Sequence, residues 1–190
     1  MKKKLTTILA MCLCAIMMVT AISPATTYAA DDYTKIKVKY NGETATFKVN
    51  MEKQGIEKTK VKTLKKKWGK PDVTDKSELR DNYQWNKNKE TGISFTENHM
   101  NPRWGGITVV AHDKAISVCG IKVGMKASKA SKILKDLGFP MFEESDKPMY
   151  DNDDAYIQTG FDEYETVTII CGIKKGKVTS IECHLYRYAD

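Results

Sequence analysis

The amino-acid sequence predicts an α+β protein of two tandem units, each with one or more short helices packed on an antiparallel sheet, preceded by an N-terminal β-hairpin. Three observations predict this fold. An Asn-Gly pair separates two alternating polar and apolar runs. Two short amphipathic stretches each end in Gly followed by Pro, and β-rich runs follow each stretch. Since 41% of the 190 residues are hydrophobic and 29% are charged, we expect a folded chain.

The N-terminus has the layout of a secretory signal. Three lysines at positions 2–4 precede an uncharged run, residues 5–22, and small residues lead to Ala29. This order predicts cleavage after Ala29, so that residues 1–29 are removed and the protein is extracellular, either free or retained at the cell surface. Two alternatives remain. The run is long enough for an uncleaved anchor, and Cys12 could carry a lipid.

The charge is unevenly spread along the chain. The formal net charge is +7, and the three signal lysines account for three of these charges, so the mature chain carries +4. Residues 31–114 contain 18 basic and 12 acidic side chains, whereas residues 115–190 contain 10 and 12. The basic excess is concentrated at residues 58–70 and the acidic residues at 143–154. We therefore expect a charge dipole.

The first half opens with the hairpin. Residues 35–40 and 43–49 alternate about Asn41-Gly42, a pair suited to a type I′ turn. A helix is predicted over residues 58–68, because Val61, Leu64 and Trp68 form one apolar stripe among lysines. Gly69 ends this helix and Pro71 prevents its continuation. Strands are expected at residues 82–85, 92–96 and 106–111, with polar stretches between them.

The second half repeats this order. A strand at residues 115–119 precedes a helix at residues 128–137, and three strands follow at residues 155–160, 165–173 and 177–185. The helix ending Leu137-Gly138-Phe139-Pro140 aligns with Trp68-Gly69-Lys70-Pro71 at an offset of 69 residues. We interpret the two units, residues 30–114 and 115–190, as a tandem duplication. Chance is the alternative, because Gly then Pro after a helix is common.

The helix endings and the run Gly120–Met125 resemble the β-lactamase-inhibitor-protein fold and its relative, the small lipoprotein domain of outer-membrane assembly machinery. The resemblance covers about residues 45–188. It implies duplicated helix-plus-sheet units and, because the inhibitors present a curved sheet to a protein target, it implies protein binding without identifying contact residues. The sequence departs from the family in its leading hairpin, in a first unit without the second Gly-containing run, and in the absence of a paired-cysteine pattern.

Three cysteines remain after the signal: Cys119, Cys171 and Cys183. The two last strands align their apolar residues if the loop between them has three residues, 175–177. Cys171 then faces Ile181 and Cys183 faces Ile169. The two cysteines become diagonal neighbours, usually too far apart for an unstrained disulfide, so buried thiols are favoured.

No motif in the sequence indicates a catalytic centre, a metal site or a cofactor. His99, His112 and His184 lack the spacing of a zinc motif, and the acidic run 151–154 lacks the spacing of a calcium loop. Cys183 and His184 are adjacent in a strand and point to opposite faces. A pair of Cys171 or Cys119 with His184 stays open, so an unfamiliar cysteine-dependent enzyme is an alternative.

We therefore expect a secreted, non-enzymatic module that binds another protein, as an inhibitor or an envelope-associated factor, through an aromatic sheet face. The expected contact residues are Tyr83, Trp85, Trp104, Tyr156, Tyr186 and Tyr188. The alternative is binding of an anionic cell-envelope polymer by the basic helix, whose contacts would be Lys62, Lys65, Lys66, Lys67 and Lys70. Neither a nucleic-acid partner nor a membrane span in the mature form is expected.

Overall fold

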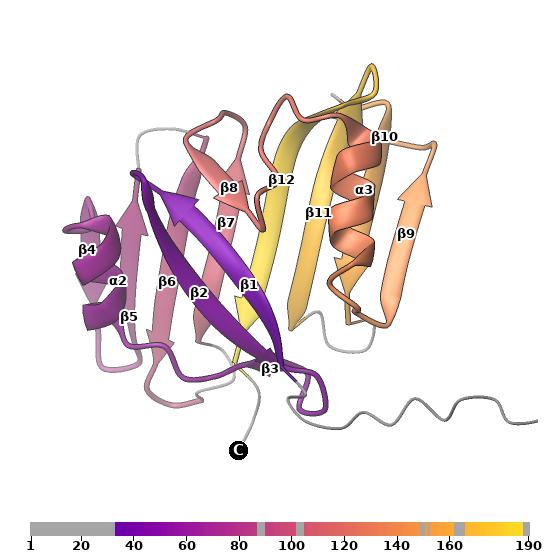
Figure 1. Ribbon diagram of the computed structural model, residues 1–190. Coiled ribbons are helices and arrows are strands. Elements are labelled where there is room, and N and C mark those ends of the chain that lie inside the picture. Colours follow the sequence, from indigo (N-terminus) through magenta and orange to yellow (C-terminus); the bar gives the residue numbers. More distant parts are fainter. Residues whose placement is uncertain are drawn as a thin grey trace, which may run out of the picture. The chain divides into compact units, whose positions relative to one another are not determined.

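The structure is a computed structural model that describes residues 33–86, 90–101, 105–148, 151, 153–161 and 166–187. The chain from Tyr33 onward forms one compact unit. Within the described ranges it contains two antiparallel sheets and two helices (Figure 1). This arrangement confirms the predicted α+β class. The predicted signal, residues 1–29, lies outside the described residues.

The smaller sheet begins with the predicted hairpin. β1 (Tyr33–Tyr40) pairs with β2 (Glu43–Asn50) through a turn in which Asn41 and Gly42 have φ of 51° and 82°. Two positive φ values in a two-residue loop identify the type I′ turn that the Asn-Gly pair predicts. The short strands β3 (Gly55–Ile56) and β8 (Ile116–Val118) complete this sheet in the order β3-β2-β1-β8.

Helix α2 (Val61–Trp68) is held by two side chains of its predicted apolar stripe. Leu64 and Trp68 are buried, and Gly69 ends the helix with a φ of 84°. The Trp68 ring meets the Trp85 ring edge-on at 5.5 Å and lies 6.4 Å from Phe47. The Trp85 indole N–H also donates to the carbonyl of Gly69 at 3.0 Å. The helix is therefore anchored to both sheets through aromatic rings.

The larger sheet has eight antiparallel strands in the order β4-β5-β6-β7-β12-β11-β10-β9. From the first half come β4 (Val73–Lys76), β5 (Arg80–Trp85), β6 (Gly92–Asn98) and β7 (Gly106–Ala111), and from the second half come β9 (Met141–Ser145), β10 (Ala155–Gly160), β11 (Val167–Lys174) and β12 (Lys177–Tyr186). The two halves meet at β7 and β12, where Ala111 lies opposite Ile181 and Gly106 opposite Tyr186. Each half runs inward from its own edge strand, β4 or β9.

The edge strands β4 and β9 were not expected, since the sequence predicts polar loops there. Neither strand contains a fully buried residue, and residues such as Asp75 and Glu143 break the apolar alternation by which strands are recognised. Backbone pairing to β5 and β10 defines them instead. Charged, short edge strands also discourage pairing with other chains.

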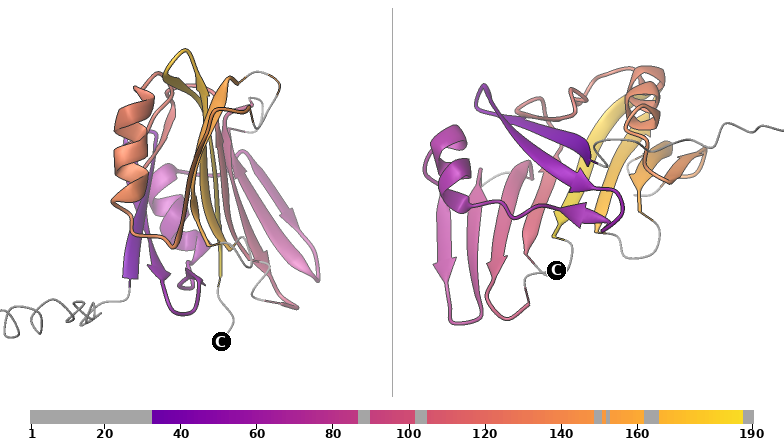
Figure 2. Two further views of the ribbon diagram at one scale, coloured as in Figure 1. Left: turned by 90° about the vertical axis from the view of Figure 1, so that its right-hand side faces the viewer. Right: turned by 60° about the horizontal axis from the view of Figure 1, so that its bottom comes forward.

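Helix α3 (Ala127–Lys135) packs on β9, β10, β11 and β12. Figure 2 shows α2, α3 and the smaller sheet on one side of the larger sheet. We call this side of the larger sheet its inner face and the opposite side its outer face. The inner face is mostly apolar, and the core lies between it and the elements that cover it. The largest fully buried side chains of the core come from all of these layers. The larger sheet contributes Trp85, Phe95, Ile93, Ile107 and Ile169, the smaller sheet Phe47 and Ile36, and the helices Leu64 and Leu134.

The β11–β12 hairpin has the predicted register but a different loop. Cys171 lies opposite Ile181 and Cys183 opposite Ile169, as expected. The three-residue loop is wrong, because Lys175 and Gly176 alone form the turn, with φ of 50° and 70°. The extra residue is accommodated as a bulge next to Gly172, where the pairing shifts by one residue. The bulge thus restores the alignment of apolar side chains that the longer loop was expected to provide.

All three described cysteines are free thiols, as predicted. Cys171 and Cys183 are fully buried on the inner face, and Cys119 is half-buried after β8. Burial raises the pKa of Cys171 to about 12, and it raises the pKa of Cys183 well above its ordinary value. Burial also raises the pKa of Cys119, although a hydrogen bond from the Lys37 backbone opposes the effect. The thiols are protonated and act as small apolar side chains.

Candidate functional site

The outer face of the larger sheet is the candidate functional site, because no described helix or strand packs on it (Figure 2, left). Its side chains alternate along each strand with those of the buried inner face. Most are half-buried and polar, and they share this face by register. They are Gln84, Ser94, Thr96, Thr108, Val110, Gln158, Tyr156, Thr168, Ile170, Glu182, His184 and Tyr186.

A row of polar side chains crosses five adjacent strands at the centre of this face. Gln84, Ser94, Thr108, His184 and Thr168 lie opposite one another in sequence from β5 to β11. Among the described residues, the hydroxyls of Ser94 and Thr108 make no hydrogen bond. The Thr168 hydroxyl is buried and likewise has no partner. Because buried polar groups are usually hydrogen-bonded, the Thr168 hydroxyl has unused hydrogen-bonding capacity.

A second row runs along β12, where Glu182, His184 and Tyr186 occupy alternate positions. The His184 Nε2–H donates to Glu182 Oε1 over 2.7 Å, since an ionised carboxylate can only accept. The Tyr186 hydroxyl lies 3.4 Å from His184 Nδ1. The imidazole and phenol rings also stack, with centroids 5.9 Å apart. The contacts with Glu182 and Tyr186 therefore hold the imidazole ring in place.

A shallow hollow of about 180 Å³ adjoins both rows. Its lining includes Gln84, Asn86, Gly92, Thr108 and Val110, and Val110 lies directly opposite Glu182 in the sheet. The absence of a side chain at Gly92 contributes to the depression. Sites for drug-sized ligands usually measure about 300–1,000 Å³. This hollow suits one or two side chains of a partner better than a whole organic ligand.

Two glycines on the outer face leave room for neighbouring groups to lie close to the sheet. A Cβ at Gly106 would lie 2.3 Å from the carbonyl oxygen of Leu185 and 2.9 Å from Cδ1 of Tyr186. A Cβ at Gly172 would collide with the carboxylate of Asp153, which accepts a hydrogen bond of 2.7 Å from the Thr179 hydroxyl beside the bulge. The glycines thus allow the Tyr186 ring and the Asp153 carboxylate to lie close to the sheet.

The expected aromatic contact surface is only partly found. Tyr83 and Trp85 share a face, as predicted, but it is the inner face, and each is only 2% exposed. Their expected role as partner contacts is therefore wrong, because the smaller sheet and α2 need these rings as core. Tyr156 and Tyr186 are half-buried on the outer face. Trp104 and Tyr188 lie outside the described residues.

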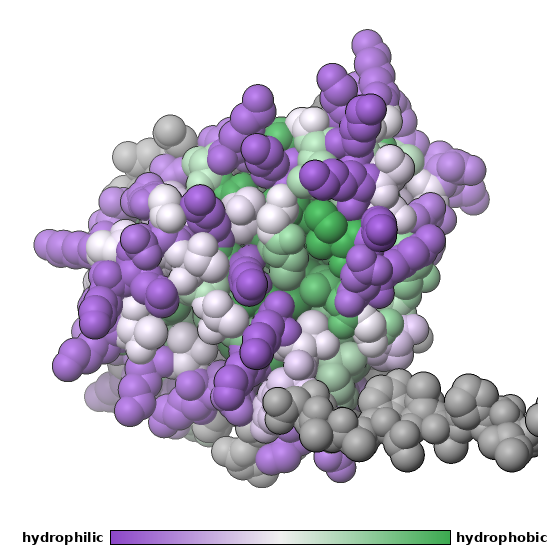
Figure 3. Space-filling model, in the orientation of Figure 1, coloured by the Kyte–Doolittle hydropathy of each residue, from purple (hydrophilic) through white to green (hydrophobic). Residues whose placement is uncertain are grey.

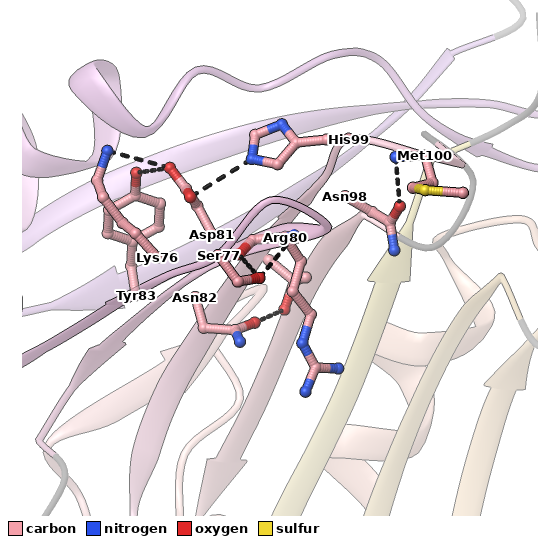
Figure 4. A network of polar contacts seen from close by, with 10 residues as sticks. Lys76, Ser77, Arg80, Asp81, Asn82, Tyr83, Asn98, His99 and Met100 are labelled. Atoms are coloured by element: carbon pink, nitrogen blue, oxygen red, sulfur yellow. Dashed lines mark hydrogen bonds and ion pairs between the residues drawn. The ribbon is translucent and has the colours of Figure 1, made fainter.

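Tyr83 instead takes part in the polar network of Figure 4. Its hydroxyl donates to Asp81 at 3.0 Å, and Lys76 and His99 lie 3.2 Å and 3.4 Å from the same carboxylate. Burial would raise the pKa of Asp81, but the hydrogen bonds from Lys76, Tyr83 and His99 hold it below its ordinary value. Burial and the Asp81 carboxylate together raise the pKa of Tyr83 to about 12. The Lys65 ammonium also lies 4.7 Å above the Tyr83 ring.

The lysines of the predicted polyanion site have unequal surroundings. Lys62, Lys66 and Lys70 are exposed, and within the described ranges no carboxylate lies within 4.0 Å of their ammonium groups. Lys67 is half-buried. Lys65 is exposed but packs on the Tyr83 ring through the contact described above. Three of the five predicted side chains are therefore fully available to an anion.

Of the two thiol–imidazole pairs that the sequence left open, the pair of Cys171 with His184 is not formed. Cys171 and Cys183 lie on the inner face, whereas His184 lies on the outer face and is paired with Glu182. The sheet therefore separates both thiols from the imidazole. Across the described part of the chain, no group of three or more His, Cys, Asp or Glu side chains could hold a metal ion. The raised pKa of the thiols also disfavours a nucleophilic cysteine.

The chain matches no family model, no curated protein and no solved structure. In the parts of the chain that are described, neither helix is long and apolar enough to cross a membrane.

The central outer-face residues, Thr108, Glu182 and Thr168, were missed by the sequence analysis, which selected aromatic rings. A signal for them was present. From Ser180 to Tyr186 polar residues alternate with Ile181, Cys183 and Leu185, so the apolar set predicts which residues are outside. What the alternation could not show is that this outside face remains uncovered.

Proposed function

We propose that this protein is a secreted, non-enzymatic module that holds another protein against the outer face of its larger sheet. The observation that carries the proposal is the central row Ser94, Thr108 and Thr168, in which the buried Thr168 hydroxyl has no hydrogen-bond partner among the described residues. It lies beside the fixed Glu182–His184 pair. A partner that hydrogen-bonds these groups, and fills the hollow with a side chain, would satisfy them.

The fold supports this proposal through the expected resemblance to the β-lactamase-inhibitor-protein family. In our interpretation the two units are α2 with β4 to β7, and α3 with β9 to β12. Each contains a helix followed by four antiparallel strands, and the two sets join at β7 and β12 into one sheet. Such a duplicated unit with one uncovered sheet face is what the resemblance implies for a protein inhibitor. Superposition of the Cα atoms of the two units tests the duplication.

The binding proposal is tested by two matched substitutions in strands. Thr108→Arg places a long charged side chain in the central row, whereas Thr46→Arg places one on the exposed side of β2 in the smaller sheet. Each immobilised variant is incubated with the extracellular fraction of the producing cells, and captured proteins are identified by mass spectrometry. We expect one partner to be retained by the wild type and Thr46→Arg and to be absent from Thr108→Arg.

Circular dichroism and thermal unfolding must show that both variants are folded. A partner retained equally by folded Thr108→Arg would contradict the outer face as the binding surface. The export part of the proposal is tested separately by N-terminal sequencing of the protein from the same fraction. We expect the sequence to begin at Ala30, since the signal pattern places the cleavage after Ala29.

A second candidate function is binding of an anionic envelope polymer by α2. It is supported by the exposure of Lys62, Lys66 and Lys70 without neighbouring carboxylates among the described residues.

Heparin serves as a model polyanion, and binding is measured at increasing salt. Replacement of the three lysines by Gln should lower the slope of log affinity against log salt, by about one for each ammonium group that pairs with the polymer. The matched control replaces Lys114, Lys147 and Lys177, which are also exposed. Equal slopes for the two triple variants would exclude the site.

A further inference from the structure

One edge of β1 is paired over only part of its length. Its neighbour β8 has three residues, which lie opposite Val38, Lys39 and Tyr40. One further bond, from the Cys119 N–H to the Lys37 carbonyl at 2.7 Å, extends this pairing. Among the described strands, none lies beside the residues of β1 before Lys37 on this side.

The register shows which backbone groups face the open side. The Glu57 N–H donates to the Lys48 carbonyl, so Lys48 directs its backbone groups toward β3. Lys35 lies opposite Lys48 in the β1–β2 pair. In an antiparallel ladder, opposite residues either bond to each other or both point away, so the N–H and C=O of Lys35 point away from β2. The same alternation directs the backbone groups of Tyr33 to the open side.

An apolar strip lies between this edge and α3 (Figure 3). The Thr34 hydroxyl donates to the Leu137 carbonyl at 3.1 Å, which fixes the end of the α3 segment beside β1. On the far side of α3, Lys135 pairs with Glu144 of β9. Ile133 and Leu137, one helical turn apart, therefore line the side that faces β1, and both are half-buried.

Lysines border the strip on both sides. Lys35 and Lys37 are exposed on β1, and Lys126 and Lys129 are exposed at the N-terminal end of α3. Within the described ranges, no carboxylate lies within 4.0 Å of these four ammonium groups. Asp136, which directly follows α3, is also exposed. The border is predominantly basic.

We propose that an extended acidic segment of a partner protein adds to β1 as a further strand, between β1 and α3. Its backbone would bond to Lys35 and Tyr33, as in other complexes formed by strand addition. Alternate side chains of an added strand point to opposite faces. One set would be apolar and cover Ile133 and Leu137, and the other would be acidic and lie beside Lys35 and Lys37. This site is separate from the outer face, so it does not depend on the function proposed above.

The test uses the full chain and a fluorescein-labelled synthetic octapeptide that alternates valine and glutamate. Binding is followed by fluorescence anisotropy. A peptide alternating valine and lysine tests the charge, and a valine–glutamate peptide N-methylated at alternate residues tests the backbone bonds. We expect the acidic peptide to bind, the basic peptide to bind at least about tenfold more weakly, and N-methylation to weaken binding by about tenfold or more.

Variants of the protein test the edge itself. Lys35→Pro removes an N–H that bonds to no described strand, and proline is tolerated in edge strands. Lys35→Ala keeps the N–H and removes the same charge. We expect Lys35→Pro to weaken binding of the acidic peptide about tenfold more than Lys35→Ala does. Lys62→Gln on α2 is the control for a general loss of charge, and it should leave the affinity unchanged within about twofold.

Three results would overturn the proposal. The first is no binding of the acidic peptide at millimolar concentration, as occurs if another segment of the chain occupies the edge. The second is equal binding of the N-methylated peptide, a measurement that does not depend on how well the proline variant folds. The third is a concentration-dependent dimer in sedimentation analysis that Lys35→Pro abolishes, which would assign the edge to a second copy.

Discussion

The ring of Tyr186 lies against the backbone of Gly106 on the neighbouring strand, so closely that a Cβ at Gly106 would lie 2.9 Å from Cδ1 of the ring. The same Cβ would lie 2.3 Å from the carbonyl oxygen of Leu185. The contact lies at the junction between β7 and β12, where the two halves of the sheet meet. Even one methyl group at this position would therefore disturb both the junction and the outer face.

Gly106→Ala should destabilise the protein by about 1–3 kcal/mol, the usual cost of overpacking. The backbone carbonyl of Leu185 cannot move without displacing the β7–β12 pair. The free energy of unfolding in urea measures the effect. Ser94→Ala, a small change on the same face, is the control and should cost less than about 0.5 kcal/mol. An unchanged urea midpoint for Gly106→Ala would show that the strands can separate there at no cost.

The Asp81 network predicts a pH-dependent contribution to stability. The pKa of Asp81 is lower in the folded protein than its ordinary value of 3.8. The contribution is therefore fully present above that value and disappears as the pH falls through the folded pKa. Asp81→Asn should be less stable than the wild type at about pH 6, and this difference should shrink at about pH 3. A difference that is the same at both pH values would exclude the carboxylate charge as its source.

The cysteines should resist alkylation in the folded protein. Burial raises the pKa of Cys171 to about 12 and that of Cys183 well above its ordinary value, so little thiolate forms at about pH 8. We expect iodoacetamide at that pH to modify Cys119 first, slowly, and to leave the two buried cysteines unmodified until denaturant is added. Mass spectrometry of peptides gives the order. Rapid modification of Cys171 or Cys183 without denaturant would support the alternative that the protein is a cysteine-dependent enzyme.

The bulge in β12 predicts an unusual tolerance to deletion. Removal of Thr179 should turn the hairpin into a regular ladder while keeping Ile181 opposite Cys171. The cost should be about 0.5–1.5 kcal/mol, the net contribution of the hydrogen bond to Asp153 that Thr179 makes. Removal of Glu182, farther along the strand, should instead turn Cys183 and Leu185 to the outer face and prevent folding. Urea unfolding compares the two deletions, and equal stability would contradict the observed register.

Much of the local structure follows from the sequence pattern. The Asn41-Gly42 turn and the stripe of Leu64 and Trp68 are determined by neighbouring residues, so short-range rules are sufficient for them. β4 and β9 could not be predicted, because they are strands by virtue of backbone pairing and lack an alternating apolar pattern. The loop at Lys175-Gly176 was wrong because a bulge several residues away compensates for its length.

The candidate site was harder to predict than the fold. Period-2 alternation correctly groups Tyr83 with Trp85, but it cannot say which face of a sheet another layer will cover. The indole of Trp85 is inside because it reaches the Gly69 carbonyl at the end of α2, a contact between distant parts of the chain. Polar residues such as Thr108 became candidates only once the covering layer was known to lie on the other side.

The last of the described strands in chain order occupies an interior position. β12 lies between β7 and β11, so all the other described strands are synthesised before the pairing of either neighbour can be completed. Until then β7 presents an unsatisfied edge, and the pairing that closes it joins residues far apart in sequence, which makes folding slow. A chain that still lacks β12 therefore cannot form the finished sheet.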